Sequence, residues 1–101
     1  MTRQEFKIEL LISATQRATE IGFNIDSDAI SSLEDIIEIG VNRMDSSQIN
    51  SPFSRGIAES NLMIIIDEMA KDARSRKLYE NLDYESFINI SLRICPLWPF
   101  C

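Results

Sequence analysis

Apolar residues recur every three or four positions along most of this chain, which is the spacing of one face of an α-helix. Polar or Gly- and Pro-containing breaks divide the pattern into segments that predict helices at about residues 3–21, 28–44, 52–77 and 83–94. Leu62–Ile66 is apolar throughout and could alone be a buried strand, but strong helix formers flank it and no second strand pattern exists to pair with it. The sequence therefore predicts an all-α, compact bundle of about four helices with the C-terminal tail, rich in proline and aromatic residues, packed on it.

Residues with known preferences mark the ends of these segments. Thr2 and Glu5 form a Thr-x-x-Glu capping box before the first helix, and Gly22 can supply the left-handed residue that ends it. Pro52 suits the first position of the third helix, and Pro96 ends the fourth, since the residue before a proline avoids helical angles. The polar stretch Asp45–Asn50 is predicted to be a connector.

Each segment has an apolar stripe that should face the core. The stripes are Phe6, Leu10, Ala14, Ala18 and Ile21 in the first helix, Ile30, Leu33, Ile37, Val41 and Met44 in the second, Ala58, Leu62, Ile65, Ile66, Met69 and Ala73 in the third, and Tyr84, Phe87, Ile88 and Ile94 in the fourth. Further isoleucines, such as Ile8, Ile12, Ile36 and Ile39, widen the stripes beyond what one small core needs.

Composition limits what this chain can be. It has 101 residues, 45% of them hydrophobic, which predicts one folded domain over residues 1–94 with a separate tail at residues 95–101. The net charge is −6, and the first half offers no basic face, so we expect no nucleic-acid partner. No apolar run approaches the roughly 20 residues of a membrane span, and the charged N-terminus is unlike a secretion signal. These features predict a cytoplasmic protein with no membrane partner, whose two cysteines are thiols.

Most catalytic chemistry is missing from the sequence. The chain has no histidine, which removes the commonest general base and metal ligand, and its three glycines are isolated, so no phosphate-binding loop can form. Two cysteines with five residues between them do not match zinc or redox motifs. We therefore predict no enzyme activity, no cofactor and no metal site.

The second helix carries the acidic residues Glu34, Asp35 and Glu38 away from its apolar stripe. The ordinary interpretation of such a run is a solvated face. The functional interpretation is a surface that meets a basic partner protein, because opposite potentials speed association.

The tail, Cys95–Cys101, contains the only tryptophan, both cysteines and two of the three prolines. Trp98 and Phe100 could pack across the bundle and complete its core. Alternatively they could anchor a partner protein, since Trp is a typical interface hot spot and prolines stiffen a displayed peptide. A third interpretation is that residues 95–101 are the core of a modified peptide whose leader is the helical part.

Together these patterns favour a small non-catalytic interaction protein, such as an adaptor, assembly subunit or inhibitor. Its predicted partner-binding residues are Glu34, Asp35, Glu38, Trp98 and Phe100. The alternatives are a self-associating scaffold, which would bury the surplus isoleucines between copies, and the precursor of a modified peptide.

Overall fold

The computed structural model describes residues 1–22, 27–75 and 91–101, without the side chains of residues 28–29 and 72–75. The described residues form helices and connecting turns and contain no strand, so the all-α prediction is confirmed. The helices are α1 (Arg3–Glu20), α2 (Ser27–Asn42), α3 (Ser46–Ile49) and α4 (Pro52–Ser75), and residues 91–94 are also helical. The predicted start of the last helix at residue 83 lies outside the described residues.

The predicted helix ends match the structure at the start of α1, its end and the start of α4. The Thr2 hydroxyl accepts a hydrogen bond from the Glu5 backbone N–H at 3.1 Å, and the Glu5 carboxylate accepts one from the Thr2 N–H at 3.4 Å. Gly22 has a φ of 86°, the left-handed conformation that stops a helix. Pro52 is the first residue of α4, as expected from its fixed φ.

The connector predicted over Asp45–Asn50 is wrong in part, because it contains the short helix α3. The Asp45 side chain accepts from the Gln48 backbone N–H at 2.9 Å, and the Gln48 side chain accepts from the Asp45 N–H at 2.9 Å. This pair is a second capping box, with Asp in place of Thr and Gln in place of Glu. The same rule that located α1 would have found it.

The Asp45 cap makes part of the stability dependent on pH. Hydrogen bonds from Ser47 and from the Gln48 backbone hold the pKa of Asp45 below its ordinary value. A lowered folded-state pKa stabilises the protein above the unfolded pKa, and this contribution is lost as the pH falls through the folded value. We expect Asp45→Asn, which keeps a capping oxygen, to flatten the fall in thermal midpoint below about pH 4. Parallel midpoint curves for the two proteins would contradict this.

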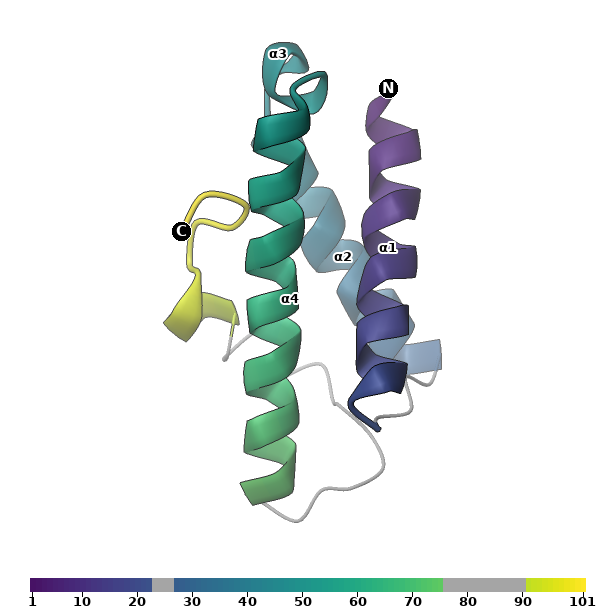
Figure 1. The fold of residues 1–101 in the computed structure, drawn as a ribbon, viewed down its shortest axis with the longest axis vertical. Coiled ribbons are helices and arrows are strands. Elements are labelled where there is room, and N and C mark those ends of the chain that lie inside the picture. Colours follow the sequence, from purple (N-terminus) through teal and green to yellow (C-terminus); the bar gives the residue numbers. More distant parts are fainter. Residues whose placement is uncertain (23–26, 76–90) are drawn as a thin grey trace.

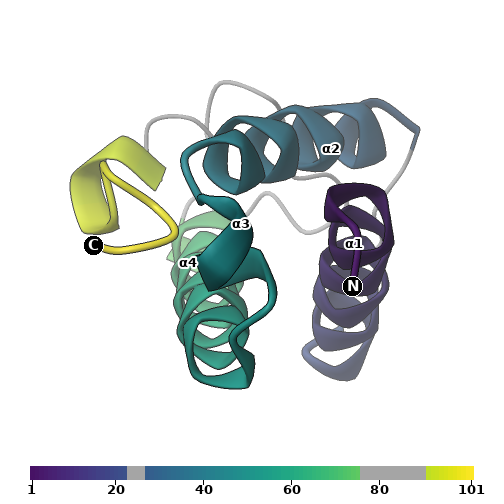
Figure 2. The same ribbon diagram turned by 90° about the horizontal axis from the view of Figure 1, so that it is seen from above.

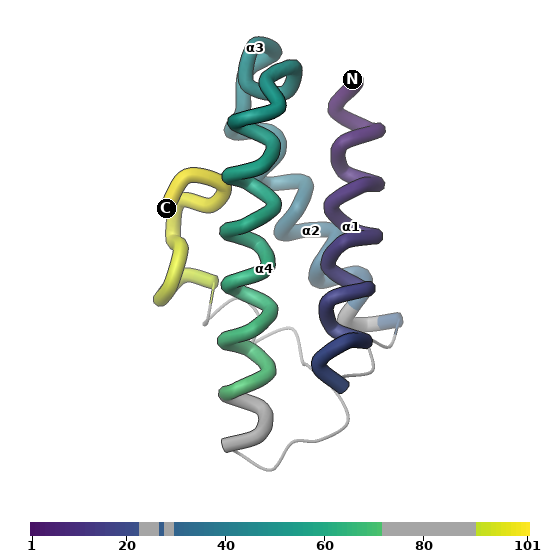
Figure 3. The backbone as a smooth tube through the Cα atoms, viewed as in Figure 1, coloured from purple at the N-terminus to yellow at the C-terminus, as the bar shows by residue number. Residues whose placement is uncertain are grey.

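The helices form two layers. Figure 1 shows α1 and α4 side by side and running in the same direction, with α2 returning behind them. Viewed from above, α2 lies across the pair, and α3 makes the turn from α2 into α4 (Figure 2). The C-terminal residues run along the side of α4 that faces away from α1, as the tube in Figure 3 also shows.

The core lies between the two layers and consists mainly of the predicted stripes. Buried residues are Phe6, Leu10, Ala14 and Ala18 from α1, Leu33, Ile36, Ile37 and Val41 from α2, Ala58, Leu62, Ile65, Ile66, Met69 and Ala70 from α4, and Met44, Ile49, Cys95 and Trp98. Ile21 is only partly buried, and Ile8, Ile12 and Ile39 are about half exposed. The predicted apolar stripe of each helix therefore faces the core, while several isoleucines outside the stripes remain at the surface.

Candidate interaction surface

A surface hollow of about 340 Å³ lies between α1 and α2, and we call it the α1–α2 groove. Its lining is Gln4, Lys7, Ile8 and Leu11 from α1 and Glu34, Ile37 and Glu38 from α2. Ile8 is 49% exposed, whereas Ile37 is buried. The groove thus combines an apolar lining with two of the predicted acidic residues.

The electrostatics of the groove are set mainly by α2. This helix has four acidic residues and no basic one between Ser27 and Asn42. Lys7 lies 3.8 Å from Glu38, a long ion pair at a surface position. Among the described residues, Glu34 has no ion-pair partner, so the groove keeps unbalanced negative charge.

The third predicted acidic residue, Asp35, lies on the other side of α2. It lines a separate hollow between α2 and the C-terminal residues, together with apolar residues that include Ile39 and Leu92. Adjacent residues of a helix point about 100° apart, which explains the separation. The structure therefore brings Glu34 and Glu38 together and places Asp35 elsewhere.

Trp98 is inside the protein. Its side chain is 2% exposed, and its indole N–H donates to the Ala58 carbonyl of α4 at 2.9 Å. The six-membered ring lies against Gly40 of α2, so closely that a Cβ atom there would stand 1.8 Å from the ring. In this structure the pocket of Trp98 is formed by α2 and α4 of its own chain, and its role toward a partner stays a prediction.

The residues around Trp98 form the C-terminal loop, Cys95–Cys101. A disulfide joins the two ends of the loop, so the prediction of two thiols is wrong. The prediction rested on a reducing compartment; disulfides persist mainly in oxidising ones, so the bond removes one ground for the cytoplasmic assignment. Phe100 is partly buried against the core, and its role toward a partner stays a prediction.

Two side chains, one from the turn after α2 and one from α4, hold the backbone of the C-terminal loop. Arg43 donates to the Trp98 carbonyl at 2.9 Å and to the Pro96 carbonyl at 3.4 Å. Asn61 of α4 donates to the Pro99 carbonyl at 2.6 Å. Sequence analysis missed Gly40, Arg43 and Asn61, although an isolated glycine within a helical pattern usually has a packing reason.

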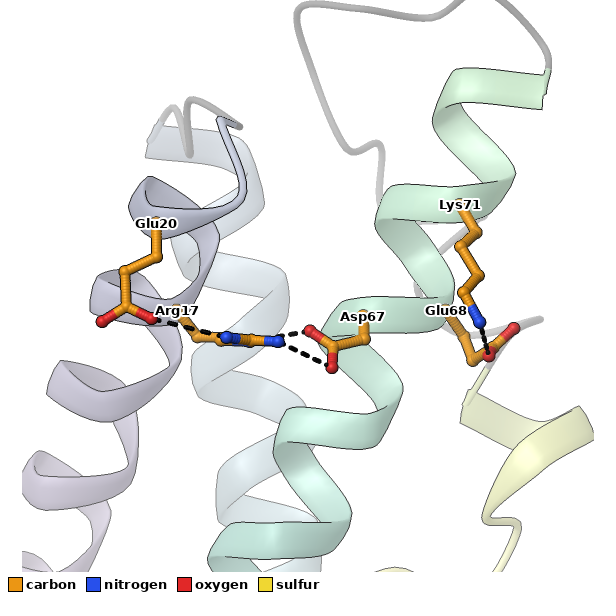
Figure 4. Close-up of polar contacts among 5 residues, drawn as sticks. All are labelled: Arg17, Glu20, Asp67, Glu68 and Lys71. Atoms are coloured by element: carbon orange, nitrogen blue, oxygen red, sulfur yellow. Dashed lines mark hydrogen bonds and ion pairs between the residues drawn. The ribbon is translucent and has the colours of Figure 1, made fainter.

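The opposite side of α4 is tied to α1 by an ion pair. Figure 4 shows the Arg17 guanidinium directed at the Asp67 carboxylate, with bonds of 2.8 and 3.0 Å, and Glu20 beside it. Hydrogen bonding to Asp67 raises the pKa of Arg17 above its ordinary value. Lys71 pairs with Glu68 on α4, also in Figure 4, and so belongs to a surface pair. These contacts orient α1 and α4 and leave the acidic side of α2 open.

Other kinds of site were sought over the same described residues. No three His, Cys, Asp or Glu side chains there are arranged to hold a metal ion. No helix in that part of the chain is long and apolar enough to cross a membrane. Comparison with protein-family models, with curated proteins and with solved structures gave no match.

Proposed function

We propose that this chain is a non-catalytic protein-interaction module that binds a basic amphipathic helix of a partner protein in the α1–α2 groove. The observation that carries the proposal is the pairing of apolar lining and unbalanced acidic charge in one groove. An amphipathic helix binds such a groove through apolar side chains spaced three or four residues apart.

The residues of the groove suggest how each part of the partner would be recognised. Ile8 and Leu11 would contact the apolar face of the partner helix, and the buried Ile37 forms part of the groove beneath them. Glu34 would pair with a Lys or Arg beside that face, and Glu38 could exchange its long contact with Lys7 for a closer one. Opposite charges of this kind mainly raise the association rate and set the orientation of the partner.

The test uses a defined probe, a labelled helical peptide composed of leucine and lysine, with a leucine and glutamate peptide of the same pattern as its counterpart. We expect the basic peptide alone to bind, with an affinity that falls as salt is added, measured by fluorescence anisotropy. Glu34→Gln with Glu38→Gln should weaken binding by about two- to thirtyfold, since exposed pairs contribute about 0.2–1 kcal/mol each.

The matched control also removes two negative charges, but at positions outside the α1–α2 groove. Glu9 and Glu59 are exposed and line none of the grooves described above. Glu9→Gln with Glu59→Gln should leave the affinity nearly unchanged. If both double variants weaken binding equally, the peptide responds to net charge and the groove is not its site.

Self-association is the competing function, and the half-exposed Ile8, Ile12 and Ile39 favour it. Analytical ultracentrifugation over a range of protein concentrations distinguishes self-association from the binding of a basic partner. A stable dimer that is dissociated by Ile8→Glu would assign the α1–α2 groove to a second copy instead of a basic partner.

A further inference from the structure

The two cysteines of the C-terminal loop differ sharply in their access to solvent. Cys101 is exposed at the end of the loop, whereas Cys95 is 1% exposed and belongs to the core cluster. The residue that carries one sulfur of the disulfide is therefore open to solvent, whereas the residue that carries the other is closed to it. Exchange rates depend on which sulfur an attacking thiolate can reach.

The disulfide lies next to the group that fixes the loop to the bundle. Trp98 occupies a pocket between Gly40 and Ala58, and the loop carbonyls around it are held by Arg43 and Asn61. We propose that the C-terminal loop is a redox-controlled latch: the disulfide keeps Trp98 between α2 and α4, and its reduction releases Trp98 while the helices persist.

The chemical step is a thiol–disulfide exchange with a small dithiol. One thiolate of the dithiol attacks the Cys101 Sγ, the Cys95–Cys101 bond breaks, and its electron pair goes to the Cys95 Sγ, which takes up a proton. The second thiolate of the dithiol then attacks the mixed disulfide and expels the Cys101 thiolate. The protein gains two thiols and the dithiol becomes a cyclic disulfide, so electrons and atoms balance.

Reduction of the disulfide raises the conformational-entropy cost of ordering the C-terminal loop. With the disulfide, the loop is a ring with a sequence separation of 6, and placing one part of it places the rest. Without the disulfide, the ring is open, and each residue between Cys95 and Trp98 must be ordered separately. Most core residues come from α1, α2 and α4, and the loop adds Cys95 and Trp98, so we expect the helices to persist after reduction with lowered stability.

Release of the C-terminal loop would also change the surface of α2 on its Asp35 side. The hollow on the Asp35 side of α2 has one wall made of Ser91, Leu92, Cys95, Pro96 and Trp98. When the loop leaves, Pro96 and Trp98 are lost from this wall, and Gly40 and Ile36 become accessible beside Ile39. The redox state would therefore decide which apolar surface α2 presents on this side, independently of the α1–α2 groove.

The experiment uses the whole chain, in which Trp98 is the only tryptophan. The oxidised protein should emit at short wavelength and resist iodide quenching. After reduction, and with two thiols per chain confirmed by titration, emission should shift to longer wavelength and quenching should rise severalfold, while far-ultraviolet circular dichroism stays helical. Reoxidation should reverse both changes.

The variant Cys101→Ser removes the disulfide by altering an exposed residue, so it deletes no atom of a buried core side chain. It should behave like the reduced protein with and without reductant. Three results would overturn the proposal: Trp98 that stays shielded in the reduced protein, two thiols that persist under oxidant, or helix loss that accompanies Trp98 exposure. The last would make the disulfide a general stabiliser of the fold.

Discussion

Trp98→Ala is expected to lower the free energy of unfolding by about 3–5 kcal/mol, the range for truncating a buried Trp. The side chain is 2% exposed, and its ring fills the space between α2 and α4 where Gly40 has no side chain of its own. A domain of this size has a total stability of about 5–15 kcal/mol, so the change is a large fraction. Urea unfolding followed by circular dichroism measures it without needing the tryptophan.

The control for Trp98→Ala is an aromatic truncation of similar size at the surface. Phe53, in the first turn of α4, is 77% exposed, and Phe53→Ala should change stability by no more than about 0.5 kcal/mol. Trp98→Phe should fall between the two, since it keeps most of the ring but loses the N–H that donates to Ala58. Equal effects of Trp98→Ala and Phe53→Ala would mean that the C-terminal loop does not pack on the bundle in solution.

The importance of Trp98 could be foreseen from the sequence, but its location could not. A stiff apolar segment must be covered by something, and the sequence left open whether its own chain or a partner supplies the cover. Helix stripes and capping boxes are local, because their residues lie within a turn or two of each other. The contact of Trp98 with Gly40 joins residues 58 positions apart, and no local rule reaches across that separation.

For the candidate site too, the spacing of residues within one helix can be read from the sequence, whereas the contacts between helices cannot. That Glu34 and Glu38 share a face follows from their spacing of four residues, whereas Asp35, three residues from Glu38, lines a different hollow because of how the neighbouring segments pack on α2. The contribution of Lys7, Ile8 and Leu11 depends on which side of α1 meets α2, which is fixed only when the helices pack. The disulfide likewise depends on the turn between Cys95 and Cys101, where Trp98 N–H donates to the Cys95 carbonyl at 3.0 Å.

The two glycines within described helices give the second large prediction, because the same substitution should have opposite effects at them. Gly56→Ala in α4 should raise the free energy of unfolding by up to about 1 kcal/mol, since alanine favours helix and an added Cβ meets nothing within 4 Å. Gly40→Ala in α2 should lower it by about 1–3 kcal/mol despite the same helix preference, because the Cβ would overlap the Trp98 ring. Trp98 emission should shift to longer wavelength in Gly40→Ala only.

A double-mutant cycle tests whether the Gly40 effect acts through Trp98. In the Trp98→Ala background the ring that a Cβ would strike is gone, so Gly40→Ala should become stabilising, as Gly56→Ala is in the native chain. The sign reversal is specific, because an effect of Gly40→Ala on α2 itself would persist in both backgrounds. Loss of stability of the same size with and without Trp98 would show that the ring does not occupy this pocket, and that Gly40 is needed for another reason.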